Sequence, residues 1–266
     1  MNEKSNERFK FGDNWKHFLK HLDNERISSA EKSLREMLET DNLKKKNFID
    51  VGSGSGLFSL AAMNLGAESV FSFDYDTQSV ACTKETKQRY LPNAKNWNIE
   101  QGSVLDQDYL KKLGQFDIVY SWGVLHHTGE MWKALENVIP LVKNGGKLFI
   151  AIYNDQGGTS QRWKKVKILY NKLPKVLKFL YVVLIMIPFE FKYALARLLK
   201  GKSPFPPKDE RGMKKYYDWV DWIGGYPFEV AKPEEIFQFY KNKGFLLEKL
   251  KTCGGGLGNN EFVFIR

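Results

Sequence analysis

Residues 47–57 read Asn-Phe-Ile-Asp-Val-Gly-Ser-Gly-Ser-Gly-Leu, and this stretch decides the fold. A short apolar run ends in glycines at positions 52, 54 and 56, which is typical of a buried strand that turns into a helix. Glycines let the backbone approach a ligand closely, because no Cβ lies in the way. A dinucleotide fingerprint would need glycine at Leu57, and the Gly-Lys-Ser/Thr of a phosphate loop does not follow. Asp50 would repel a pyrophosphate but attract an ammonium or sulfonium group.

Strand-like and helix-like segments alternate after this loop, and the alternation predicts a parallel sheet covered by helices on both faces. The expected strands lie at 68–74, 96–102, 116–120 and 147–153, followed by two more at 245–251 and 261–266, and the expected helices include 78–90, 131–142 and one that starts at Pro233. Upstream, Ser28–Glu31 has the spacing of a capping box and predicts the start of a helix. We expect an N-terminal helical cap over 1–46 and a domain over 47–266, with a helical lid inserted at about 155–230.

The glycine loop, the strand segment Phe116–Tyr120 with Leu125-His-His127 after it, and Lys143–Leu148 together resemble the class I S-adenosylmethionine-dependent methyltransferases. The segments Phe9–Trp15 and Asp218–Glu229 resemble a subgroup that acts on small molecules. The resemblance implies an α/β fold with a Rossmann-like, mostly parallel seven-stranded sheet whose last strand is antiparallel. It also implies S-adenosyl-L-methionine as cofactor, a helical insertion after the fifth strand, and no metal.

The resemblance also assigns the cofactor's contacts. In this family the acid and glycine loop hold the amino-acid part, an acid after the second strand binds the ribose, and the loop after the third strand holds the adenine. Ser103 stands where that last loop commonly carries a carboxylate, and Asp106 is the next carboxylate along the chain. The cofactor-binding residues expected on this basis are Trp15, Asp50, Gly52, Ser53, Gly54, Gly56, Asp74, Ser103, Val104, Leu105 and Trp122.

Candidates for the chemistry lie beyond the carboxyl ends of the strands, where open parallel sheets bind ligands. An oxygen nucleophile of high pKa needs a base, and His127 is the candidate for that role, the alternative being that it caps a helix or packs on the cofactor. The residues expected to contact the substrate are His126, Tyr153, Asn154, Asp221, Trp222 and Tyr226. Each of them has a structural alternative, such as bonding the backbone of the insertion or packing a loop.

The chain's net charge of +10 is concentrated in one segment. Residues 161–215 hold fifteen Lys and Arg against three acids, so the remaining chain carries about −2. Four interpretations stay open: the segment attracts an anionic small substrate, docks on anionic lipid, grips RNA, or is a solvated surface. The absence of an Asn-Pro-Pro-Tyr-type loop after the fourth strand, where Ser121–Val124 stands, argues against methylation of nucleobase amino groups. The apolar run Phe179–Phe189 is about 16 Å long as a helix, too short to span a bilayer.

We therefore expect a bacterial, cytoplasmic enzyme that methylates an oxygen of a small anionic metabolite or of a precursor in surface-carbohydrate biosynthesis. The N-terminus lacks the apolar run of a secretory signal, and the two cysteines, Cys82 and Cys253, suit a reducing compartment. One alternative is a lipid-linked or quinone-type acceptor, with peripheral membrane contact through residues 160–200. A second alternative is an inactive regulatory protein that keeps the cofactor-binding fold. Nucleic acid is not the expected partner.

Overall fold

The computed structural model describes residue 9, residues 11–204 and residues 215–266. The expected features at 1–8, at Lys10 and at 205–214, including the basic residues 208, 211 and 214, lie outside the described residues. The chain divides into an α/β unit (residues 10–160 and 227–266) and a helical unit (residues 161–226 with the segment that ends at Phe9). The helices of the α/β unit are α1 (Phe11–Leu19), α2 (Asn24–Leu38), α3 (Leu57–Asn64), α4 (Thr77–Tyr90), α5 (Gln107–Leu113), η2 (Leu125–His127), α6 (Met131–Asn137), η3 (Ile139–Leu141) and α10 (Pro233–Asn242).

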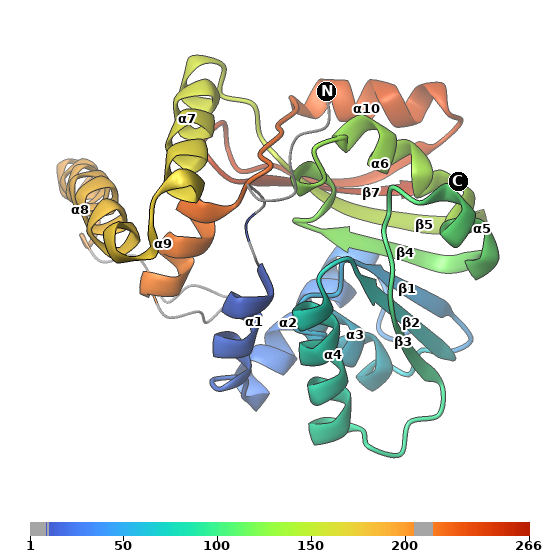
Figure 1. Cartoon of the computed structure of the whole chain (residues 1–266). Coiled ribbons are helices and arrows are strands. Elements are labelled where there is room, and N and C mark those ends of the chain that lie inside the picture. The colour runs from blue at the N-terminus through green and yellow to red at the C-terminus, as the bar shows by residue number, and fades with distance from the viewer. Residues whose placement is uncertain (1–8, 10, 205–214) are drawn as a thin grey trace. The chain divides into compact units, whose positions relative to one another are not determined.

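A single seven-stranded sheet forms the centre of the α/β unit, in the order β3-β2-β1-β4-β5-β7-β6 (Figure 1). Its strands are β1 (Asn47–Val51), β2 (Ser69–Asp74), β3 (Trp97–Gln101), β4 (Phe116–Trp122), β5 (Val142–Tyr153), β6 (Leu246–Lys251) and β7 (Asn259–Ile265). The pairs among β1 to β5 are parallel, and β7 runs antiparallel between β5 and β6. The predicted Rossmann-like sheet with an antiparallel last strand is confirmed.

Two hydrophobic cores lie on opposite faces of this sheet because strand side chains alternate between the faces. In β1, Ile49 and Val51 belong to the core beneath α5, α6 and α10, whereas Phe48 belongs to the core beneath α2 and α3. Figure 1 shows these two helical layers on either side of the strands. Asp50 has the same parity as Phe48, so its carboxylate is directed into the α3 layer.

The boundaries of two helices differ from the prediction. Helix α2 begins at Asn24, four residues before Ser28, because the carboxylate of Asp23 accepts the backbone N–H of Arg26 and caps the helix. The capping box predicted at Ser28–Glu31 is therefore wrong, since these residues lie inside the helix. The predicted helix 131–142 ends at Asn137 and is followed by the short η3, which contains Pro140.

The helical unit consists of α7 (Gly158–Lys172), whose first turn belongs to the α/β unit, α8 (Lys175–Leu199) and α9 (Lys215–Gly224). Helix α8 has 25 residues and continues through Pro188, so it is far longer than its apolar stretch 179–189. By length and composition alone it would be able to cross a membrane. The expectation that this segment is too short to span a bilayer is therefore wrong, because charged and apolar residues on both sides of the apolar run extend the same helix.

Candidate active site

The glycine loop turns over the carboxyl ends of β1 and β2. The backbone N–H groups of Gly52 and Ser53 both donate to the carbonyl of Phe73, at 2.8 and 3.1 Å, which fixes the start of the loop on the neighbouring strand. The glycines at 52, 54 and 56 have φ values of +85°, +55° and +77°, a region that side chains with a Cβ rarely adopt. A Cβ on Gly52 would lie 2.4 Å from Val124 Cγ1. The loop geometry therefore requires glycine for both conformation and space.

Two threonines of α4 form hydrogen bonds with carbonyl groups of the glycine loop. The hydroxyl of Thr86 donates to the carbonyl of Ser55 at 2.6 Å, and that of Thr83 lies 3.2 Å from the carbonyl of Gly54. Thr83 also lies 2.9 Å from the Ser53 hydroxyl. Both threonines are buried. The sequence prediction did not include them, although their three-residue spacing on a predicted helix was a signal that they share one face.

Asp50 ends a buried chain of hydroxyl groups. Ser59 Oγ donates to the Asp50 carboxylate at 2.6 Å, Ser72 Oγ lies 2.7 Å from Ser59 Oγ, and the Trp97 indole N–H donates to Ser72 at 2.8 Å. Because the indole only donates, the chain is polarised toward the carboxylate and favours its ionised form. Burial acts in the opposite direction and is the larger effect, so the pKa of Asp50 is raised to about 7. A cation brought to this acid would restore its charge.

Asp74 lies at the end of β2 and closes on the same loop. Its two carboxylate oxygens accept the backbone N–H groups of Gly54 at 3.0 Å and of Asp76 at 2.9 Å. Burial raises the pKa of Asp74 to about 6, against the effect of these two hydrogen bonds. Asp50 and Asp74 therefore stand on either side of the glycine loop, with both carboxyl groups easier to protonate than free aspartate.

The loop after β3 continues this edge of the sheet. Ser103 Oγ accepts the backbone N–H of Leu105 at 3.2 Å, and the buried Asn137 donates to the carbonyl of Val104. Asp106 accepts the N–H groups of Asp108 and Tyr109 as the N-cap of α5. Its carboxylate therefore has a structural task as the cap of α5.

Helix α1 covers the glycine loop. A Cβ on Gly54 would lie 2.8 Å from the indole Nε1 and Cε2 of Trp15, so this ring rests directly against the loop. The helix is anchored on α4, since the backbone N–H of Gly12 donates to Asp76 at 3.0 Å. Trp15, predicted as a cofactor contact, thus lies next to the loop that the same prediction assigns to the cofactor.

The paired histidines and Tyr153 form a cluster at the ends of β4 and β5. His127 donates from Nδ1 to the carbonyl of Pro227 at 2.6 Å, which leaves Nε2 as the nitrogen that can take up a proton. Its ring lies 4.8 Å from that of Phe11 and 5.4 Å from that of Tyr153. His126 is fully buried, and its Nδ1 accepts the backbone N–H of Tyr153. His126 therefore has the contacts of a residue that supports the cluster from within the fold.

A short segment, residues 227–231, forms hydrogen bonds with this cluster and is called the strap. The N–H of Glu229 donates to the carbonyl of His126 at 3.0 Å, and its carboxylate accepts the N–H of Met131 at the start of α6. The strap continues to Ala231, which bridges to Asn154. Glu229 and Pro227 were not expected as site residues, and their roles as backbone and capping partners have no signature in sequence.

Asn154 and Trp122 complete the predicted residues of the α/β unit. The amide of Asn154 donates to the carbonyl of Gly256, and its oxygen accepts from Asn260, both at 3.1 Å. Both ends of this side chain thus hold the loop before β7, whereas the structural alternative expected for it was a bond to the backbone of the insertion. Trp122 ends β4, half-buried against the core of the α3 face.

The remaining predicted substrate contacts, Asp221, Trp222 and Tyr226, belong to the helical unit. There the fully buried Lys167 donates to the carbonyl of Trp222 and its Nζ lies 4.4 Å from the centre of the Trp222 ring. Burial lowers the pKa of Lys167 to about 7, and the nearby Asp221 opposes that shift. Tyr226 accepts the backbone N–H of Phe9 through its carbonyl. These residues organise the interior of their own unit, and their contact with a substrate stays a prediction.

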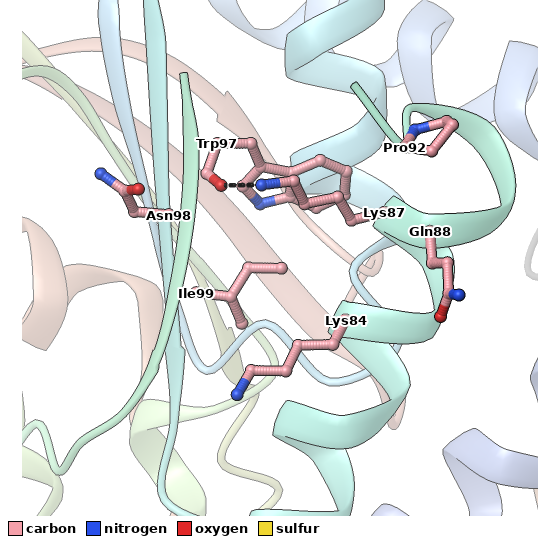
Figure 2. Close-up of a pocket in the computed structure, with 7 residues that line it drawn as sticks. All are labelled: Lys84, Lys87, Gln88, Pro92, Trp97, Asn98 and Ile99. Atoms are coloured by element: carbon pink, nitrogen blue, oxygen red, sulfur yellow. Dashed lines mark hydrogen bonds between the residues drawn. The ribbon is translucent and has the colours of Figure 1, made fainter. Parts of the chain in front are cut away.

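A pocket elsewhere in the α/β unit lies between α4 and the start of β3 (Figure 2). Figure 2 shows Lys87 reaching across it to the carbonyl of Trp97, at 2.5 Å. The pocket faces the beginning of β3, at the opposite end of the strand from the glycine loop, and it contains none of the predicted site residues. In the described part of the chain, no group of three or more His, Cys, Asp and Glu side chains is arranged to hold a metal ion.

The strand order, the glycine loop and the acids at the ends of β1 and β2 define a class I methyltransferase fold. Residues 49–148 match the family described as "Methyltransferase domain". The chain thus contains a methyltransferase domain of the S-adenosylmethionine-dependent class. Among solved structures, magnesium protoporphyrin IX methyltransferase from Synechocystis PCC 6803, with S-adenosylhomocysteine bound, has the same fold with a TM-score of 0.56 and 14% identity. That match covers 96% of this chain and 93% of the other.

Curated relatives match the same region. A ribosomal protein L11 methyltransferase of Prochlorococcus marinus is 33% identical over 133 residues, which are 50% of this chain and 41% of that protein. A tRNA U34 carboxymethyltransferase of Pseudomonas aeruginosa is 31% identical over 118 residues, 44% of this chain and 35% of that one. The match thus spans less than half the length of either relative. The two are named for a protein and a tRNA acceptor, so the shared domain does not specify the acceptor.

Proposed function

We propose that the protein transfers the methyl group of S-adenosyl-L-methionine to an oxygen atom of a small, anionic acceptor. The observation that carries the first half of this proposal is the glycine loop, held open by Phe73, Thr83 and Thr86 between two acids of raised pKa. The second half rests on the charge distribution, because eleven Lys and Arg against one acid occupy residues 161–204 of the predicted lid. A carbohydrate precursor bearing phosphate fits that charge.

The loop's own geometry fits the proposed cofactor. The glycines at 52, 54 and 56 let the loop take a left-handed backbone close against Val124, Trp15 and Thr83, and Asp50 lies two residues before Gly52. Asp50 and the glycine loop would hold the amino-acid part, Asp74 would bind the ribose hydroxyls, and Ser103, Val104 and Leu105 would flank the adenine. Gly52, Ser53, Gly54, Gly56, Trp15 and Trp122 form the rest of the wall. When bound, the cofactor supplies an activated methyl group on a positively charged sulfur.

The chain's own contribution is alignment, exclusion of water and removal of a proton. Alignment and water exclusion supply much of the rate in a displacement whose leaving group is neutral. His127 takes the acceptor's proton at Nε2, because Nδ1 is committed to the carbonyl of Pro227. The imidazolium that forms is then stabilised by that same carbonyl. Phe11 and Tyr153 pack on the ring and restrict its rotation.

The proposal is tested by measuring S-adenosylhomocysteine release from purified protein supplied with S-adenosylmethionine and a panel of acceptors. The panel pairs phosphorylated and nucleotide-linked sugars with their uncharged counterparts, and includes tRNA and a basic ribosomal protein. We expect turnover with at least one anionic small molecule and none with its neutral counterpart. Turnover with only tRNA or only the protein would contradict the proposed acceptor class while leaving methyl transfer intact.

A further inference from the structure

Helix α8 carries an exposed apolar stripe along its whole length. The six residues of the stripe are spaced by three or four positions, and each is between 47% and 70% exposed: Leu180, Leu184, Ile187, Phe191, Leu195 and Leu198. This spacing places all six on one side of an α-helix, over about 27 Å. The opposite side packs within the helical unit, where Val182 and Met186 are buried. Soluble helices bury such a stripe, so its exposure requires a partner.

The opposite side of α8 is fixed to its own unit by specific contacts. Tyr181 donates its hydroxyl to the carbonyl of Val166 in α7, and the Trp219 indole of α9 donates to Glu190 at 3.0 Å. The rings of Trp163 and Phe189 also pack edge to face, 5.6 Å apart. If α8 crossed a bilayer, the polar α7 and α9 would have to enter the hydrocarbon with it, or these contacts would break. The helix is therefore arranged to lie along a surface.

The charge of the same region selects the partner. Residues 161–204 contain eleven Lys and Arg, of which Lys167 is buried, against a single acid, Glu190. Helix α7 exposes the adjacent pair Lys164 and Lys165. Two copies of such a surface would repel each other, whereas an anionic partner is attracted. Nucleic acid offers phosphates but no broad apolar surface to cover six aliphatic and aromatic side chains. An anionic lipid surface offers both.

We propose that the helical unit docks on an anionic membrane surface, with the stripe of α8 inserted among the acyl chains and the lysines of α7 and α8 near the lipid headgroups. This inference does not depend on methyl transfer. It also gives the domain a location from which acceptors attached to lipid become accessible.

The test is flotation of the full-length protein with vesicles of phosphatidylcholine alone or with one-third phosphatidylglycerol. We expect at least tenfold stronger binding to the anionic vesicles. Leu184→Ser/Ile187→Ser and, separately, Lys164→Glu/Lys165→Glu should each weaken it at least tenfold. Leu246→Ser/Leu250→Ser on the exposed edge strand β6 and Lys111→Glu/Lys112→Glu on α5 are matched controls that should bind as the parent protein does.

Several outcomes would overturn the docking proposal. One is no flotation of a folded, monodisperse protein at low salt, and another is unchanged binding by the two stripe substitutions. A dimer that these substitutions convert to monomers would show that a second copy covers the stripe. Binding of a short RNA that depends on Lys164 and Lys165 but not on Leu184, together with no flotation, would show a nucleic-acid surface. Titration of each variant with S-adenosylmethionine separates any of these results from a failure of the methyltransferase proposal.

Discussion

The α/β unit buries the apolar side chains of its central strands, whereas the helical unit exposes a row of apolar side chains on α8. In the sheet, Leu148, Phe149 and Ile150 are fully buried in succession, because both faces of β5 are covered by helices. In α8, Leu184 and Phe191 are 61% and 70% exposed. Burial of the β5 side chains stabilises the fold. Exposure of the α8 side chains lowers solubility, which is tolerated where a partner covers them. The comparison suggests that the two units have separate tasks, one in holding the cofactor and the other in reaching the acceptor.

The largest expected effect is on the stability of the sheet. Leu148→Ala should lower the free energy of unfolding by about 2–5 kcal/mol, because it leaves a cavity in a closed core. Leu184→Ala on α8 should change it by less than about 0.5 kcal/mol, since the side chain is already in water. Urea unfolding of both variants measures the difference. Equal losses would mean that the stripe is covered within the folded chain.

Substitution of His127 should lower kcat more than it lowers the affinity for the cofactor. His127→Ala should reduce kcat by roughly 100-fold or more, the usual effect of removing a general base, with cofactor affinity changed less than about threefold. His127→Asn, whose amide nitrogen takes the position of Nδ1 and donates to Pro227 but takes up no proton, should be equally slow. Unchanged turnover of His127→Ala on an acceptor whose oxygen is protonated would remove the assignment as base.

Gly52 of the glycine loop can be compared with Gly114, a second glycine of positive φ. Gly52→Ala places a Cβ 2.4 Å from Val124 in a residue with φ of +85°, whereas Gly114→Ala adds one in open space at a φ of +75°. Both should lose stability from the backbone, and Gly114→Ala the more, because its φ of +75° with ψ of −148° is a region that only glycine adopts readily. Only Gly52→Ala should weaken S-adenosylmethionine binding, by roughly tenfold or more. Similar affinities in calorimetry would show that the loop does not contact the cofactor.

The next prediction concerns Asp50 and the pH dependence of stability. Its pKa in the fold, about 7, exceeds its value in the unfolded chain, so the protonated form is the one that folding favours. The contribution of Asp50 is therefore fully present below about pH 4 and is lost as the pH rises through about 7. Asp50→Asn should raise the free energy of unfolding at pH 8 by about 1–3 kcal/mol, and flatten its decline between pH 5 and 8.

The same substitution should weaken cofactor binding, because an amide does not pair with an ammonium group. Asp106→Asn is the matched control, since asparagine also caps a helix and Asp106 is exposed on α5. Asp106→Asn should change neither the free energy of unfolding nor the affinity for S-adenosylmethionine. A destabilised Asp50→Asn at pH 8 would mean that the carboxylate is stabilised in the fold, contrary to its burial.

The sheet and the glycine loop were predictable because their signals are local. A buried strand followed by three glycines, and acids at Asp50 and Asp74, stand in a fixed order along the chain. Thr83 and Thr86, which hold the loop, come from a helix whose register on the loop depends on packing. Asp106 shows the same limit, since only the structure reveals that α5 uses it as a cap.

Helix boundaries failed for a related reason. Asp23 and Ser28 both have the side chain of an N-cap, and the choice between them was made by how α2 packs on the sheet. The length of α8 was underestimated because the apolar run Phe179–Phe189 was taken to mark the helix ends, although helices continue through lysines when one face packs. Hydropathy locates an apolar run, but it does not show which residues outside the run stay helical.

The most direct test is a calorimetric titration of the purified chain with S-adenosyl-L-methionine, without acceptor, at pH 7.5. We predict saturable binding at one site, weakened by Gly52→Ala and Asp50→Asn and unaffected by Gly114→Ala and by substitutions on the α8 stripe. Absence of binding at millimolar ligand by a folded protein, or equal affinity of all four kinds of variant, would contradict the assignment of the glycine loop as the cofactor site.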